Sequence, residues 1–206
     1  MKKTKVTKES RLAYLKKVYK LNKELLISIN SILNKDNVDE EKTIDILTML
    51  KGGITKINSG KNLEFIYNLH QKILIKSKVT PPINKVLFVN FLTMYNSLST
   101  RKKNKIKYER KLLLLIEYYL MIEQDIILAQ QIEFIIYIIH ELINNHKNSS
   151  IFQFGFLYLK ISEILNKRKL TFQYSNELNE IKKIISLNIP NSNKGKELTT
   201  LLEKKN

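Results

Sequence analysis

The stretch LLLLIEYYLMIEQDIILAQQIEFIIYIIHELI, which spans residues 112–143, decides the fold class. It is the most apolar part of the chain, and it contains no Lys or Arg. Carboxylates interrupt it repeatedly, whereas a membrane-spanning helix needs about 20 predominantly apolar residues with few charges. Glu117, Gln124 and Gln131 recur every seven residues, as expected of the water-exposed stripe of a mostly buried helix. We therefore predict that residues 112–143 form a buried helical core.

Helical periodicity extends from this stretch toward both ends of the chain. Near the start, Leu12, Leu15, Tyr19, Leu26 and Ile29 recur at steps of three, four or seven residues, as on one face of a helix. No alternating apolar and polar run is bounded by turn signals on both sides, so we predict no sheet. The expected helices cover about residues 12–33, 39–52, 63–75, 80–98, 100–124, 125–145, 151–165 and 176–187.

These expectations define an all-α fold, either a single compact multi-helix bundle or a short helical-repeat array of about eight helices. The sequences LEFI at 63–66 and IEFI at 132–135 resemble each other, but one pair of matches does not establish a repeat. We expect residues 1–190 to form a single all-helical domain with a basic N-terminal segment, and residues 191–206 to form a polar tail that frays. Whether residues 100–124 and 125–145 form one bent helix or two helices is open.

Local signals mark the ends of the second predicted helix. Asp39 is a suitable cap, and Glu40 and Glu41 follow it where a helix start is electropositive. The pair Gly52-Gly53 can supply a left-handed stop. We therefore expect this helix to be short.

The chain has no Cys, so it can form neither a disulfide nor a thiolate zinc site. It begins with the polar, basic run Met1-Lys2-Lys3-Thr4-Lys5 and lacks the apolar stretch of a secretory signal peptide. Both features predict an intracellular protein, located in the cytoplasm or in the nucleoid or nucleus.

The formal net charge of +17 is concentrated in two segments. Residues 1–23 carry nine Lys or Arg against Glu9, and residues 101–111 carry seven against Glu109, so their net charges are +8 and +6. Codon bias in an A/T-rich genome would raise the lysine content, but it would spread the lysines more evenly. The cations of residues 101–111 point to all sides of a helix, so we expect this segment to stand clear of the core.

The two basic segments are the candidate nucleic-acid-binding site. Clustered cations displace the counterions of a phosphate backbone without reading its sequence. With four Arg against 32 Lys, we expect backbone or shape recognition rather than base reading. Tyr108 lies inside the second segment, where its ring could stack on an unpaired base or pack in the core. The candidate residues are Lys2, Lys3, Lys5, Lys16, Lys20, Lys23, Arg101, Lys102, Lys103, Lys105, Lys107, Tyr108, Arg110 and Lys111.

The histidines and carboxylates form no catalytic or metal-binding motif. His140 and His146 are six residues apart, whereas the zinc-protease helix needs four, and Asn144 occupies that position. The Glu that di-iron helical proteins place three residues before a His is missing before all three histidines. We interpret His70 as a partly buried structural residue. The sequence therefore predicts no metal site, no cofactor and no enzymatic activity.

Together these observations predict a non-enzymatic helical binding protein that docks on nucleic acid or a ribonucleoprotein through its lysine-rich segments. The alternative is a protein-protein interaction scaffold or accessory subunit that binds an acidic partner. A third role is contact with a membrane surface through the first helix, where Lys16, Lys20 and Lys23 lie opposite an apolar stripe. A broad exposed apolar groove would favour the scaffold, whereas two basic segments on one face would favour nucleic acid.

Overall fold

The computed structural model describes residues 24, 27, 31, 39–56, 60–99, 105–122, 124–146 and 150–204. In this part of the chain the regular secondary structure is helical, without any strand, so the all-α prediction is confirmed. The helices are α2 (Glu40–Lys56), α3 (Gly60–Lys76), α4 (Pro81–Ser99), α5 (Lys105–Tyr119), α6 (Ala129–His146), α7 (Ile151–Lys167), α8 (Ser175–Asn188) and α9 (Asn193–Glu203), with short 3-10 helices η1 (Gln124–Ile126) and η2 (Thr171–Tyr174).

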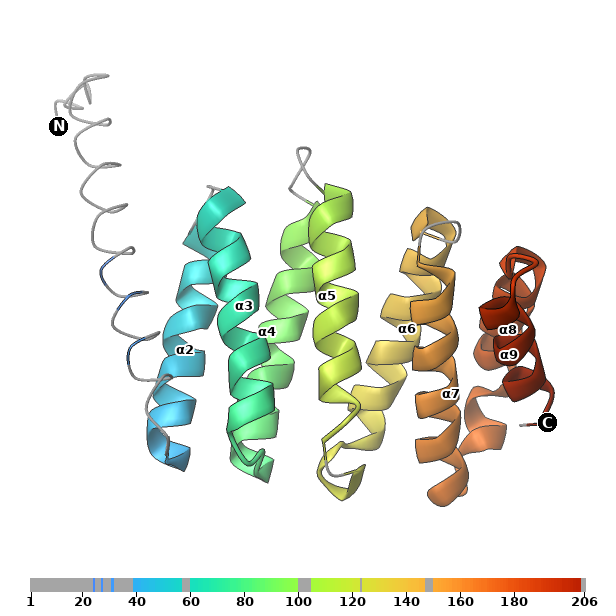
Figure 1. Cartoon of the computed structure of the whole chain (residues 1–206). Helices are drawn as coiled ribbons and strands as arrows, with labels where there is room; N and C mark the ends of the chain where they lie inside the picture. Colours follow the sequence, from blue (N-terminus) through green and yellow to red (C-terminus); the bar gives the residue numbers. More distant parts are fainter. Residues whose placement is uncertain are drawn as a thin grey trace, which may run out of the picture.

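The helices stack side by side in two layers (Figure 1). One layer contains α2, α4, α6 and α8, and the other contains α3, α5, α7 and α9. The pairs α2–α3, α4–α5 and α6–α7 are hairpins, while α8 packs on α6 and α7 and α9 packs on α7. The described helices therefore form an extended array of hairpins rather than a bundle around one axis. Among them, none is both long enough and apolar enough to cross a membrane.

The helix boundaries confirm some local predictions and correct one. Asp39 caps α2, because the backbone N–H of Lys42 donates to its Oδ1 at 2.8 Å. The predicted stop at Gly52-Gly53 is wrong, since α2 continues to Lys56. Burial of Ile54 in the core explains the continuation, because its packing offsets the cost of about 1 kcal/mol for each helical glycine. The predicted helix over residues 12–33 lies outside the described residues, apart from residues 24, 27 and 31, which are helical.

The predicted frayed tail is also wrong, because residues 193–203 form α9. The Ser192 hydroxyl oxygen caps this helix by accepting from the Gly195 backbone N–H at 3.1 Å. Leu198 and Leu202, one turn apart, are both buried. On α7, Gly155 permits the close approach, since a Cβ there would lie 2.7 Å from the Leu198 methyl carbons. The packing of Leu198 against Gly155 and the burial of Leu202 thus hold α9 on the array.

Helix α4 carries two buried asparagines, Asn84 and Asn90, and each is the centre of a hydrogen-bond network. The network of Asn90 holds α4 to the preceding hairpin α2–α3. The Asn90 amide nitrogen donates to the Leu47 carbonyl oxygen at 2.8 Å and contacts His70 Nε2 at 2.9 Å. Because the Asn90 nitrogen is a donor, His70 Nε2 accepts and Nδ1 donates to the Ile66 carbonyl at 2.9 Å. His70 is fully buried rather than partly buried, and this burial lowers its pKa to about 4. The ring is therefore neutral and structural.

The second network joins α4 to the α5–α6 connection and to α6. The Asn84 amide nitrogen donates to the Ile126 carbonyl at 2.8 Å and to Gln131 Oε1 at 2.9 Å. The Tyr119 hydroxyl bonds to both side chains, and the Leu128 backbone N–H donates to Gln131 Oε1 at 2.8 Å. The predicted exposed stripe is therefore wrong at Gln131, which is buried because these groups satisfy its amide oxygen.

Candidate docking groove

Helix α7 is apolar on two sides, and only one of them lies in the core. Phe154 and Leu157 are buried, whereas Phe152, Phe156 and Leu159 are partly exposed. The three partly exposed residues are spaced by four and three positions, so they form one stripe along about 10 Å of the helix. A helix that is apolar on more than one face presents a second surface for burial.

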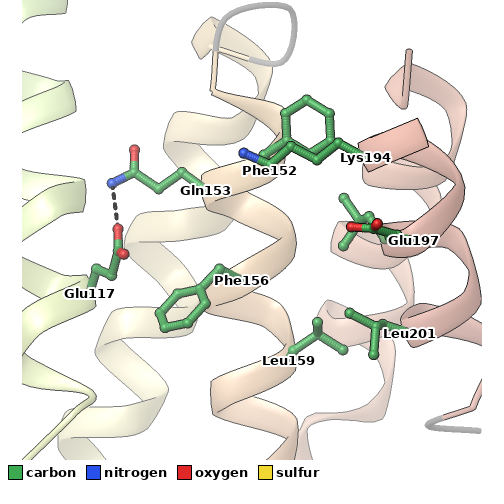
Figure 2. Close-up of a pocket in the computed structure, with 9 residues that line it drawn as sticks. Glu117, Phe152, Gln153, Phe156, Leu159, Lys194, Glu197 and Leu201 are labelled. Carbon is green, nitrogen blue, oxygen red and sulfur yellow. Dashed lines mark hydrogen bonds between the residues drawn. The ribbon is translucent and has the colours of Figure 1, made fainter. Parts of the chain in front are cut away.

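This second face of α7 forms the floor of an open groove between α5 and α9 (Figure 2). Phe156 points toward α5, and Leu159 lies toward Leu201 of α9. Leu201 is 50% exposed although its neighbour Leu202 is buried. The groove has a volume of about 410 Å³ and is lined by Glu117, Phe152, Gln153, Phe156, Leu159, Lys194, Glu197, Leu198 and Leu201.

Polar side chains surround the apolar floor. The Gln153 amide nitrogen donates to Glu117 Oε2 at 3.0 Å, which links α7 to α5. The Lys194 ammonium lies 4.8 Å from the centre of the Phe152 ring, a cation–π contact (Figure 2). The exposed Glu197 adds a second carboxylate. The lining therefore carries two carboxylates and one ammonium, in a chain whose overall charge is +17.

The structure describes only part of the predicted basic site. Lys105, Lys107, Tyr108, Arg110 and Lys111 belong to α5. The other candidates lie outside the described residues, so their position relative to these five is not defined: Lys2, Lys3, Lys5, Lys16, Lys20, Lys23, Arg101, Lys102 and Lys103.

Three lysines on α5 are paired with carboxylates. The Glu64 carboxylate on α3 accepts from Lys107 Nζ at 2.7 Å and lies 3.3 Å from Lys111 Nζ. Hydrogen bonding to Lys107 is the main reason that the pKa of Glu64 lies below its usual value. Lys105 Nζ lies 3.6 Å from Glu109 on the same helix. These contacts reduce the positive potential that the sequence suggests for this segment.

The described part of this segment, residues 105–111, does not stand clear of the core, contrary to the prediction. Tyr108 is 2% exposed, and its ring stacks on Tyr67 with centroids 6.0 Å apart. Glu109 is buried as well. Of the two positions expected for Tyr108, the structure has the core one, because the ring packs between α3 and α5; its assignment to the nucleic-acid-binding site is wrong.

The two histidines whose side chains the structure describes both make contacts within the protein. His70 is enclosed in the core, and His140 Nε2 lies 2.8 Å from Glu180 Oε2 of α8. Within the described residues, no group of three His, Cys, Asp or Glu side chains is placed to hold a metal ion. The side chain of His146 is not among those described.

Sequence reasoning missed the groove residues on α7 and α9. The available signal was the nearly continuous apolar run from Ile151 to Leu165, which exceeds what one buried stripe requires. The partner helix α9 gave no such signal. Comparisons of the chain with protein-family models, curated proteins and solved structures find no match.

Proposed function

We propose that this chain is a non-enzymatic protein-interaction scaffold that docks an amphipathic helix of a partner protein in the groove between α5, α7 and α9. The observation that carries the proposal is the partly exposed stripe of Phe152, Phe156 and Leu159 facing Leu201. Stacked helical hairpins form extended surfaces that suit protein binding. The groove extends along two helical turns, which matches a partner with apolar side chains at helical spacing.

The charges of the groove refine the expected partner. Glu117 and Glu197 are acidic, while Lys194 lies against the Phe152 ring. A partner helix with basic residues beside its apolar stripe complements these carboxylates. This partner differs from the acidic one expected from the overall charge, because the local charge of the groove differs from that of the whole chain.

The test compares two leucine substitutions in a pull-down from native lysate at about 150 mM salt. Leu201→Glu places a charge in the groove, and Leu187→Glu makes the same change at a 75% exposed leucine of α8 outside it. We expect the wild type and Leu187→Glu to retain the same protein, and Leu201→Glu to bind it at least about tenfold more weakly. Equal retention by all three proteins would show that the groove is not the docking site.

Nucleic-acid binding is the second candidate function, and the segregation of charge into residues 1–23 and 101–111 favours it. Neutralising Lys102, Lys103, Lys105 and Lys107 together is expected to weaken binding similarly for unrelated sequences and to reduce its salt dependence. Nuclease treatment of the pull-down separates the two candidates. Loss of the bound material after nuclease supports nucleic acid, whereas resistance supports the scaffold.

A further inference from the structure

The connections α3–α4, α5–α6 and α7–α8 lie together at one end of the array, the lower end in Figure 1. Two hydrogen bonds join them. Asn84, at the start of α4, donates to the Ile126 carbonyl in the α5–α6 connection at 2.8 Å. The guanidinium of Arg168, directly after α7, donates to the carbonyl of Ile127. These bonds hold the three connections close to one another at this end.

This end exposes large apolar side chains. Ile75, Met121, Leu128 and Phe172 are between 59% and 93% exposed, and Phe172 is the most exposed of them. Ile75 and Met121 also line a shared hollow of about 420 Å³ together with Lys78. Single exposed apolar residues are common, but a group of them at one end of a molecule indicates a contact surface.

The connection before Phe172 places a cation in a strained backbone position. Lys169 has φ of 59°, and α7 ends with bonds from the Lys169 N–H to Asn166 O at 3.1 Å and from the Leu170 N–H to Leu165 O at 2.9 Å. Glycine usually occupies this left-handed position because a Cβ is disfavoured there. Lys169 is exposed, so the strained position holds an accessible cation three residues before the exposed ring.

Cations outnumber carboxylates on these connections. Residues 76–80, 120–128 and 167–174 contain five Lys or Arg against two carboxylates, a net charge of +3. Lys76, Lys78 and Lys169 are exposed, as is Asp125. The end therefore combines projecting apolar side chains with a positive charge.

We propose that this end of the array binds an anionic lipid surface, with the Phe172 ring inserted among the lipid headgroups. Apolar side chains such as Phe bury at the boundary between the headgroups and the acyl chains, and nearby lysines are attracted to anionic headgroups. These apolar residues belong to the last turn of α3, the α5–α6 connection and η2, with Lys78 and Lys169 close to them in sequence. A fluid, negatively charged surface accommodates such a discontinuous edge.

The first experiment is flotation of the full chain with phosphatidylcholine vesicles that contain or lack phosphatidylserine. We expect binding to the phosphatidylserine vesicles and little to the neutral ones. Phe172→Ala should lower the partition coefficient about tenfold, because the inserted ring is lost. Leu187→Ala, at the far end of α8, is the matched control and should bind like the wild type, since Leu187 is 75% exposed but distant from this surface. Both side chains are exposed, so both variants should keep the wild-type circular dichroism.

The second experiment separates the cation from the backbone geometry. Lys169→Gly removes the charge and relieves the left-handed strain, and should lower the partition coefficient about fivefold. Lys169→Arg keeps the charge and should bind like the wild type. Failure of the wild type to float with phosphatidylserine vesicles overturns the proposal. Binding that is equal for the wild type, Phe172→Ala and Lys169→Gly also overturns it, because the attachment would then lie elsewhere on the chain.

Discussion

The first half of the described array (α2–α5) and the second half (α6–α9) fill the spaces between their helices differently. In the first half, polar contacts join adjacent helices: Asn90 contacts His70 and Leu47, and Glu64 contacts Lys107 and Lys111. In the second half, α9 packs on α7 with Leu198 opposite Gly155, and the neighbouring apolar surface stays open. The first arrangement fixes helix positions, whereas the second leaves a surface for a partner.

Removing the amide of Asn90 should have the largest effect on stability. In Asn90→Leu, the Leu47 carbonyl and His70 Nε2 lose their buried donor, which we expect to cost about 4 kcal/mol. Urea denaturation monitored by circular dichroism measures this loss. Asn179→Leu, at an exposed position on α8, is the control and should change stability by less than about 0.5 kcal/mol. A similar stability of the two variants would contradict the importance of the polar contacts.

Acid should weaken the first half through His70. Burial lowers the pKa of His70 to about 4 from 6.5, so the unfolded chain binds a proton that the folded chain excludes between these values. The free energy of unfolding is therefore unaffected by this histidine above pH 6.5. It falls progressively as the pH is lowered to about 4, by about 3 kcal/mol in total. Urea midpoints across this range test the prediction. In His70→Gln the urea midpoint should depend less steeply on pH. An unchanged slope would contradict the assignment of this pH dependence to His70.

Overfilling the contact between α7 and α9 should have an intermediate effect. In Gly155→Val, the added atoms meet the Leu198 methyl groups, and we expect a loss of about 2 kcal/mol as α9 is displaced. Gly155→Ala should cost less, because the end of the Leu198 side chain can shift. Limited proteolysis within α9 reports the displacement of this helix, and urea denaturation measures the loss of stability. Wild-type stability in Gly155→Val would mean that α9 does not depend on this close approach.

The ion pairs of Glu64 should contribute least to stability. Exposed pairs contribute little, so Glu64→Gln is expected to cost less than about 1 kcal/mol. A double-mutant cycle with Lys111→Gln measures the coupling between the two side chains. The coupling should disappear at about 1 M salt, where charges are screened within a few ångströms. A coupling that persists at high salt would show that the contact acts through packing instead of charge.

The sequence predicts the helices of the described core well because their apolar periodicity is long and repeated. It fails for α9, where Leu198 and Leu202 are the only buried large apolar side chains and Leu198 packs against Gly155, more than 40 residues earlier. It fails at Gly52-Gly53 because Ile54 belongs to the core. In both cases a tertiary contact outweighs the local signal, and no local pattern contains that information.

The candidate sites likewise depend on tertiary contacts that the local sequence does not contain. The basic residues of α5 are evident in the sequence, but their pairing with Glu64 depends on the position of α3. Tyr108 lies among cations and is nevertheless buried against Tyr67. The groove depends on how closely α9 approaches α7, so its apolar residues resemble ordinary core residues until both helices are in place.

The two asparagines of α4 have a consequence for the folding reaction. Helices rich in Ile and Leu can pair with a wrong neighbour, because apolar faces discriminate poorly among one another. Among the described residues, Asn84 finds its partners on α5, the α5–α6 connection and α6, and Asn90 finds its partners on α2 and α3. A mispaired α4 would bury an amide without a hydrogen bond and would dissociate more readily. We therefore expect the asparagines to disfavour incorrect stacking orders while the array assembles.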